Sequence, residues 1–283
     1  MSNKKSNVAF MPIVRKPEYN WDGFKKHWLF DNALATHFVN AMHAVFPDGE
    51  KAFIRSVKRY ADQIQDKDLK DRIKAFIGQE AQHMTQHKSF WDHLRKDSSA
   101  LDDFLEFYNK TAYGYFEDFS EKVSGGKMRL SVTVALEHYT AIMAEAALEN
   151  DSKLLDDMPE EMKAMLKWHA AEEIEHKSVA FDVLKEVDDS YLLRAAGMAY
   201  ATIALSFYIG LAQAMFIAKD EDIDLLKIPS QLFQFVERAT PLFSKIAGNV
   251  LDYFRLDFHP EDNDNRYLVE EVLKKPESLR LVV

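Results

Sequence analysis

Apolar residues recur at spacings of three and four along most of the chain, a pattern typical of amphipathic helices. No convincing alternating strand with a hairpin turn occurs. The pattern therefore predicts an all-α fold. Helices are expected over residues 31–65, 69–96, 101–123, 128–149, 160–187, 190–218 and 229–256.

Breaks in this pattern mark where the elements end. Pro47 and Gly49 predict an interruption of the first helix, which would place Glu50 in the first turn of a restarted segment. Gly125 and Gly126 predict a helix end. Residues 1–30 are expected to form an irregular aromatic and basic lead-in. The chain from Asp257 is expected to form an acidic loop and then a poorly determined terminus.

One expected helix contains a long uncharged stretch. Residues 195–218 carry no formal charge and are flanked by Arg194 and Lys219. That length is sufficient to span a bilayer. Because Ala, Gly, Ser and Gln dilute its apolar content, we favour burial in an extended bundle or in a dimer interface. Membrane association is kept as the alternative.

Composition narrows the class of protein. The chain has 283 residues, 47% of them hydrophobic, which is sufficient for an ordered core of one or two domains. A net charge of −10 argues against general nucleic-acid binding. The absence of cysteine excludes disulfides, iron–sulfur clusters and cysteine nucleophiles. No secretory signal precedes the first helix, so a cytoplasmic location is expected, with membrane association through residues 195–218 as the alternative.

The candidate chemistry lies in a repeated motif. Glu80 and His83, and again Glu173 and His176, form Glu-x-x-His. Residues three apart on an α-helix lie about 60° apart around its axis, so each pair faces one partner. Two such pairs, with one glutamate from each of two further helices, form the carboxylate-bridged di-metal centre of ferritin-like bundles.

Two lone glutamates complete this pattern. Glu50 and Glu80 have their midpoint at residue 65, where residues 65–68 form a polar turn. Glu137 and Glu173 have theirs at residue 155, within the helix-stop and helix-start signals of residues 150–159. In an antiparallel hairpin, residues equidistant from the turn meet at one height. We therefore predict one metal site, with a buried salt-bridge network as the alternative.

Several side chains near the motif are weaker candidates for metal ligands or for groups that support the ligands. His169 and His87 each lie four residues from their motif, so either could be a seventh ligand or a group that orients a carboxylate. His138 directly follows Glu137, and its side chain points about 100° away from that of Glu137 around the helix axis. The side chains of Glu172 and Glu175 point away from the helix face that carries the predicted ligands. We expect them to be solvated or to pair with Lys177 or other neighbours.

The ligand types also limit the metal. Carboxylates and imidazoles without thiolates favour two divalent ions, iron first, with manganese or an iron–manganese pair as alternatives. Zinc is a weaker candidate that ligand type alone does not exclude.

Four segments around these residues resemble a known family. FPDGEKAF, FIGQEAQHMTQHKSFW, VALEHYTA and WHAAEEIEHKSVAFDV resemble the bacterial family of predicted metal-dependent hydrolases, which is grouped with ferritin-like folds. The similarity covers about residues 15–260. The ligand set also resembles that of the di-iron arylamine N-oxygenases. They have an additional histidine four residues before the last Glu-x-x-His, and this resemblance implies that His169 is the seventh ligand.

These observations predict a ferritin-like four-helix bundle with a long crossover and additional C-terminal helices. Residues 1–30 would be the lead-in, residues 31–187 the bundle with its crossover at 101–123, and residues 188–283 a helical extension with an acidic tail. The predicted ligands are Glu50, Glu80, His83, Glu137, His169, Glu173 and His176. Glu80 and Glu173 would bridge the ions, while Glu50 and Glu137 would be terminal or bridging ligands.

Three functions agree with such a site. The first is a non-haem di-iron or iron–manganese oxidase or oxygenase that activates O₂ on an unidentified small, apolar substrate. An external electron donor is expected for it, since no flavin or nicotinamide motif occurs. The second is a two-metal hydrolase that uses a metal-activated water. The third is a non-catalytic metal-binding or ferroxidase-like protein. A homodimer is compatible with all three.

Overall fold

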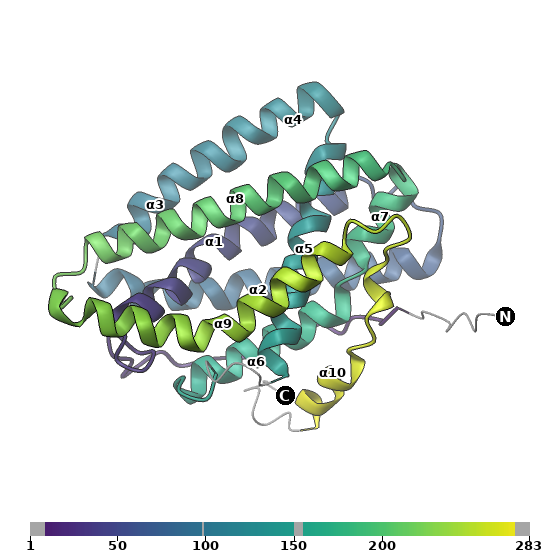
Figure 1. The fold of residues 1–283 in the computed structure, drawn as a ribbon. Helices are drawn as coiled ribbons and strands as arrows, with labels where there is room; N and C mark the ends of the chain where they lie inside the picture. The colour runs from purple at the N-terminus through teal and green to yellow at the C-terminus, as the bar shows by residue number, and fades with distance from the viewer. Residues whose placement is uncertain (1–8, 98, 150–154, 275–283) are drawn as a thin grey trace.

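The computed structural model of the chain describes residues 9–97, 99–149 and 155–274, which form helices and no β-strand (Figure 1). The predicted all-α class is confirmed. The α-helices are α1 (Ala33–Lys58), α2 (Lys67–Asp97), α3 (Ala100–Tyr108), α4 (Phe116–Ser124), α5 (Lys127–Leu148), α6 (Glu160–His176), α7 (Val179–Val187), α8 (Tyr191–Ala218), α9 (Ile228–Asp252) and α10 (Arg266–Leu273).

Two helix pairs form the centre of the fold. α1 and α2 pack along each other after a turn at residues 59–66, where the Asp66 side chain accepts a hydrogen bond from Leu69 N and so begins α2. α5 packs on α6, which follows Pro159. Of the second predicted turn, residues 150–154 lie outside the described residues. The two pairs pack together, an arrangement compatible with a ferritin-like bundle.

The predicted break in the first helix is wrong. α1 runs without interruption through Pro47, and Glu50 lies in its interior. Proline has no N–H to give to the carbonyl four residues earlier, here that of His43. Trp91 of α2 donates its indole N–H to that carbonyl at 2.8 Å. A neighbouring helix therefore satisfies the group that the proline leaves free.

The crossover between the two pairs contains an irregular segment. α3 is followed by a π-helical stretch, Asn109–Tyr115, and then by α4. α4 ends where Gly125 and Gly126 adopt φ values of +60° and +91°. These left-handed conformations favour glycine, so the predicted helix end is confirmed. π-Helical turns often lie at functional sites.

The last predicted bundle helix is two helices. α6 ends at His176, and α7 begins at Val179 after a two-residue turn at Lys177 and Ser178. Lys177 turns toward the C-terminal region, where its ammonium group donates to Asn263 O at 2.6 Å and Asn265 Oδ1 at 2.8 Å. The bundle helix is thus interrupted directly after the last predicted ligand.

α8 is one continuous helix, as predicted, but most of its apolar surface is not hidden within the chain. A single stripe of α8 packs on α1 and α5. This stripe consists of Arg194, Gly197, Met198, Ala201, Ile209, Ala212 and Phe216. The 18-residue window of α8 that could cross a membrane by length and composition has a mean hydropathy of 1.7, and only 17% of it is buried.

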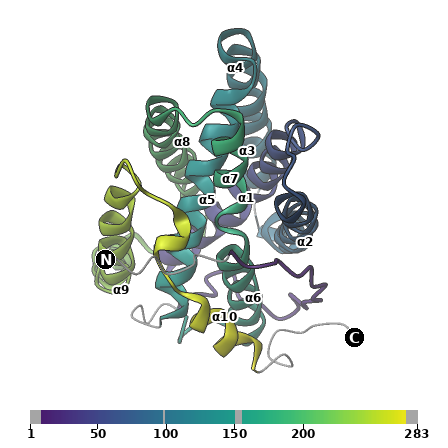
Figure 2. The same cartoon turned by 90° about the vertical axis from the view of Figure 1, so that its right-hand side faces the viewer.

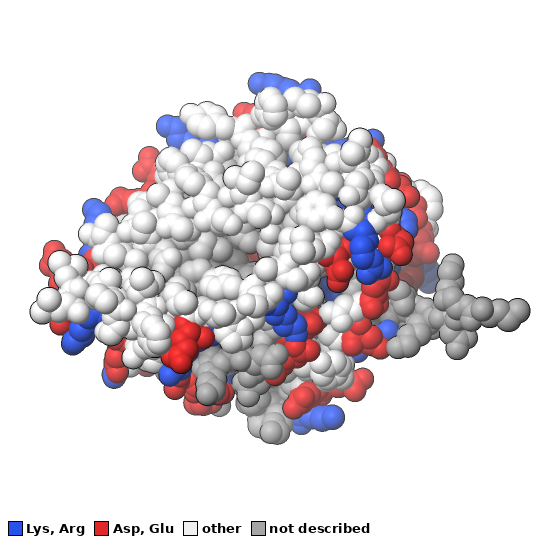
Figure 3. Space-filling model, in the orientation of Figure 1, with Lys and Arg blue, Asp and Glu red and all other residues white. Residues whose placement is uncertain are grey.

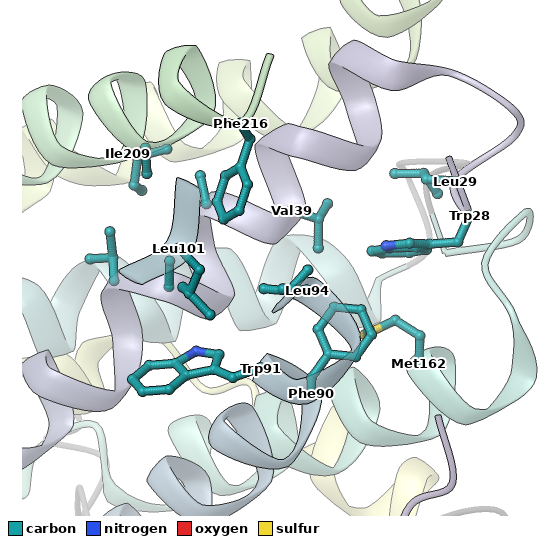
Figure 4. Close-up of a cluster of buried hydrophobic side chains, with 14 of the residues drawn as sticks. Trp28, Leu29, Val39, Phe90, Trp91, Leu94, Leu101, Met162, Ile209 and Phe216 are labelled. Atoms are coloured by element: carbon teal, nitrogen blue, oxygen red, sulfur yellow. The ribbon is translucent and has the colours of Figure 1, made fainter. Parts of the chain in front are cut away.

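The C-terminal region is more ordered than expected. Residues 266–273 form α10, which packs against α6 through Leu268 and Val269. The described chain after residue 187 also contributes to the central core. Ile209 and Phe216 of α8 lie among the same buried side chains as Val39 and Phe90 (Figure 4). The predicted boundary at 187/188 therefore crosses a shared core, and its status as a domain limit stays a prediction.

The helices of the molecule lie on two opposite sides of its centre. Viewed end-on, α8 and α9 lie on one side and α2 on the other (Figure 2). α8 approaches α5 closely at Gly197, where a methyl group would overlap the Ser131 side chain and lie 2.7 Å from its backbone carbonyl oxygen. Only glycine permits this distance between the helices.

Gly197→Ala is therefore expected to lower the free energy of unfolding by about 1–3 kcal/mol, the usual cost of overpacking a well-packed interface. Gly210→Ala on the same helix is the matched control, because a methyl there meets no atom within 4 Å. Its expected effect is neutral or slightly stabilising, since alanine favours helix. Urea denaturation measures both changes. Equal effects of the two variants would show that α8 does not pack closely on α5.

Candidate metal centre

The seven predicted ligands lie together in the middle of the bundle. α1 contributes Glu50, α2 contributes Glu80 and His83, α5 contributes Glu137, and α6 contributes His169, Glu173 and His176. None of the seven exposes more than 5% of its surface. The hairpin argument predicts this placement, because each lone glutamate lies level with its Glu-x-x-His pair.

The seven side chains divide into two groups, each suited to one ion. One ligand atom from each of Glu50, His83 and His169 lies within 4.8 Å of the other two. The same limit holds for Glu80, Glu137, Glu173 and His176. Two groups of side chains that could each hold a metal ion therefore lie side by side. Ligation itself stays a prediction for all seven residues.

Two carboxylates lie between these groups. Glu173 Oε1 is 2.8 Å from His169 Nε2 and 3.3 Å from His83 Nδ1, while its Oε2 is 3.3 Å from His176 Nε2. Glu80 Oε1 is 3.1 Å from His176 Nε2 and 3.7 Å from His83 Nδ1. Each carboxylate faces histidines of both groups, the geometry that a bridging ligand needs.

The donor set fits bound cations. Both carboxylate oxygens of Glu50, Glu80 and Glu137 are buried without a hydrogen-bond partner among the described residues, and so is His83 Nδ1. Burying an unpaired carboxylate is costly in free energy. Cations placed among these oxygens would remove that cost.

Without cations, the site would hold protons instead. Burial raises the pKa of Glu50 well above its ordinary value, and burial together with the nearby Glu80 carboxylate raises the pKa of Glu137 to about 8. Burial lowers the pKa of His83, but the neighbouring carboxylates of Glu172 and Glu173 outweigh it and raise that pKa to about 10. Metal binding is therefore expected to release protons.

Glu172 supports the ligand His83 from behind. Its Oε2 lies 3.2 Å from His83 Nε2, so it can accept the proton of the nitrogen that faces away from the cluster. Trp168 Nε1 donates to Glu172 at 3.0 Å, and Arg15 pairs with it at 3.1 Å. A carboxylate in this position fixes the histidine tautomer and raises its basicity.

A parallel arrangement supports His176. Gln79 Oε1 lies 3.0 Å from His176 Nδ1, and Gln79 Nε2 donates to Glu175 Oε2 at 2.8 Å. Arg15 makes paired hydrogen bonds to the Glu175 carboxylate at 2.9 and 2.8 Å. One arginine therefore anchors the supporting groups of both Glu-x-x-His histidines.

The expectation that Glu172 and Glu175 are solvated is therefore wrong, and neither pairs with Lys177. Both are buried, and their neighbour Arg15 from the lead-in pairs with both carboxylates. Sequence reasoning missed Arg15 because it lies more than 150 residues from its partners. A basic residue within the aromatic lead-in was the only signal, and that signal does not identify a partner.

The other two histidines occupy different positions. His87 lies behind His169, with its Nε2 3.0 Å from His169 Nδ1 and 3.6 Å from Glu50 Oε1. His87 Nδ1 lies 2.8 Å from His43 Nδ1. This placement agrees with His87 as a supporting group. His138 points away from the cluster, as predicted, and its Nε2 lies 3.2 Å from Asn249 O.

Two apolar pockets reach the cluster. The first has a volume of about 1010 Å³, its open mouth included, and reaches Glu50 and Glu173. Its walls come from α1, α5, α8 and the π-helical stretch. The second, of about 870 Å³ by the same measure, lies between α1, α5, α6 and α9 and reaches Glu173 and His169. Phe46, Thr140 and Met143 line both pockets, so the two spaces adjoin at the cluster.

Comparison with known proteins identifies one related family. The model of a family described as "Predicted metal-dependent hydrolase" matches residues 13–264, which include all seven clustered residues. No curated protein and no solved structure matches the chain.

Glu137→Gln is expected to reduce the metal content strongly while the metal-free fold persists. In the folded metal-free protein, the pKa of Glu137 is about 8, above the ordinary value of 4.5. The folded state then binds a proton more tightly than the unfolded chain, so stability falls as pH rises through that window. The metal-free variant should therefore melt higher than the metal-free parent above pH 8, and the difference should shrink toward pH 4.5.

Elemental analysis and melting curves measure these two effects. Glu145→Gln is the matched control on the same helix, because Glu145 is buried but accepts hydrogen bonds from Asn265 and pairs with Lys245. It should leave the metal content unchanged. Unchanged metal content in Glu137→Gln, with a lower melting temperature, would favour the salt-bridge network instead.

Glu172→Gln is expected to weaken metal binding by about 10- to 100-fold, although no ligand is removed, because a neutral amide supports His83 less well than a carboxylate. Competition with a chelator measures the affinity. Glu160→Gln is the control on the exposed start of the same helix, where Glu160 pairs with Lys163. Equal affinities for parent and Glu172→Gln would show that the Glu172–His83 contact does not tune the site.

Proposed function

The chain belongs to the family of predicted metal-dependent hydrolases, and we propose that it is an enzyme that holds two divalent ions in the buried Glu/His cluster and oxidises an apolar molecule with O₂. The family indicates a metal-dependent enzyme. The reaction type is our inference from the ligand set. The observation that carries it is the set of four buried carboxylates and three imidazoles at the end of an apolar pocket.

The net charge of the metal-occupied cluster favours oxidation over hydrolysis. Four carboxylates balance the charge of two divalent ions, so the occupied cluster would be close to neutral. A neutral cluster attracts electrons from a bound water less strongly than a cationic one, which makes it a weaker source of nucleophilic hydroxide. Hard oxygen donors instead suit iron and manganese. Bound there, these metals would supply electrons for the reduction of O₂, and an external donor would restore them.

The protein's own residues would position the substrate and limit water. Val132, Leu136 and Phe116 line the first pocket between α5 and the crossover. Besides Glu50 and Glu173, its charged residues are Arg55, Glu117 and Arg129. Glu117 pairs with both arginines, at 3.3 Å for Arg129 Nη1. Arg129 also pairs with Glu121 at 3.0 Å. Because these charged groups are paired, the pocket favours an apolar molecule.

Hydrolysis is the second candidate, and the family description favours it. A water activated between two ions would attack an ester or amide carbonyl. Arg15 and Glu172 would act in the same way as for oxidation, because they orient His83 whatever the reaction. Metal identity and consumption of O₂ separate the two reactions.

Protein purified without added metal is expected to contain about two iron or manganese ions per chain, as two-metal chemistry requires. The reduced protein should consume O₂ in single turnover and change its visible spectrum. Elemental analysis, an oxygen electrode and absorption spectroscopy measure these properties. His176→Ala is the control, and it should neither consume O₂ nor change its visible spectrum. If the protein does not consume O₂ but cleaves medium-chain nitrophenyl esters in its zinc or manganese form, it is a hydrolase instead.

A further inference from the structure

The outward sides of α8 and α9 are largely uncharged, and their exposed charged residues are Glu237 and Asp252 of α9. At helical spacing, each helix presents an exposed stripe without a charged residue. We call these two stripes the apolar face. On α8 the stripe is Leu192, Ala196, Ala199, Ile203, Phe207, Gly210 and Ala214, and on α9 it is Leu232, Val236, Thr240, Phe243, Ala247 and Leu251. The outward stripe of a helix in water is normally polar, so this face calls for a partner.

Three charged side chains of these helices pair with other segments of the chain. Lys245 pairs with Glu145 at 3.1 Å, and Arg238 pairs with Asp157. Arg194 donates to Arg255 O at 2.7 Å. The space-filling view shows the result, a broad white surface over α8 and α9 with charges gathered at its edges (Figure 3). The face therefore offers neither an anionic nor a cationic patch for electrostatic docking.

The apolar face is continuous with the pockets at the metal centre. Phe243 is 44% exposed on the face and also lines the second pocket. Ala204 and Leu205 of α8 line the first pocket from the other side. Figure 3 shows the surface hollowed between the two helices. An apolar molecule at this face therefore has an apolar path to Glu173, which both pockets share.

We propose that the apolar face rests on a lipid bilayer, and that an acyl-chain substrate reaches the metal centre from that bilayer through the hollow between α8 and α9. α8 has the hydropathy of a membrane segment, but one side of it packs on α1 and α5, so the helix lies along the bilayer surface. A second copy of the chain on this face would cover Phe243 and the hollow. A bilayer covers the face and also supplies the substrate.

The chemistry of the face specifies the lipid. With a net charge of −10 and no lysine or arginine on the face, anionic headgroups offer no attraction. Binding should therefore need only zwitterionic lipid, and added anionic lipid should not strengthen it. The substrate class rests on the proposed function, whereas binding of the face to lipid does not.

The test is flotation of the full-length protein with phosphatidylcholine vesicles. The parent should float with the vesicles, and Ile203→Glu and Leu251→Glu should each bind at least about tenfold more weakly, the effect of losing one buried large apolar side chain. Both residues are more than 70% exposed, so the substitutions should not disturb folding. Thr85→Glu, exposed on α2 on the opposite side, is the charge-matched control and should float like the parent.

Three results would overturn the proposal. One is a parent that stays unbound and monomeric. The second is a parent that stays unbound as a dimer which Ile203→Glu converts to monomer, because the partner is then a second copy. The third is equal binding by the parent and both face variants. Glu137→Gln should float normally even if it lacks metal, so loss of the proposed chemistry and loss of docking are separate outcomes.

Discussion

The structure depends on the burial of four carboxylates at one point between four helices. Glu50, Glu80, Glu137 and Glu173 are each no more than 4% exposed, and three of them have no hydrogen-bond partner for either oxygen among the described residues. In an apolar interior these groups repel one another, and burial together with neighbouring carboxylates raises the pKa of Glu50 and Glu137. Bound cations are the simplest means of stabilising them. The bundle therefore holds a site that is strained without metal and suited to it.

The surroundings of the cluster hold the ligands in fixed orientations. Two histidines that face the cluster each make a hydrogen bond on their far nitrogen, one to Glu172 and one to Gln79. Arg15 joins these two supports by pairing with Glu172 and Glu175. The lead-in is consequently part of the site, although it contributes no predicted ligand. This extended network explains how a segment without regular structure remains packed on α6.

The apolar regions of the molecule form one path. Apolar pockets reach the cluster from both sides of Phe46, Thr140 and Met143, and α8 and α9 continue that apolar lining to the outer surface. A metal centre buried in this cluster would be shielded from water, while this path would admit apolar molecules. The apolar surface that α8 exposes at the end of this path thus supports a substrate taken from a lipid phase.

Local patterns along the chain were sufficient to predict the fold class and the seven residues that cluster. Helical periodicity is local, and the level positions of Glu50 with Glu80 and of Glu137 with Glu173 follow from hairpin geometry. Three features depended on contacts between distant segments. α1 continues through Pro47 because Trp91 of another helix satisfies the freed carbonyl. Glu172 and Glu175 are buried because Arg15 lies against them. One side of α8 is exposed because α1, α3 and α5 pack against the other side. Such contacts between distant segments leave no periodic signal along the chain, so they can be seen only in the folded molecule.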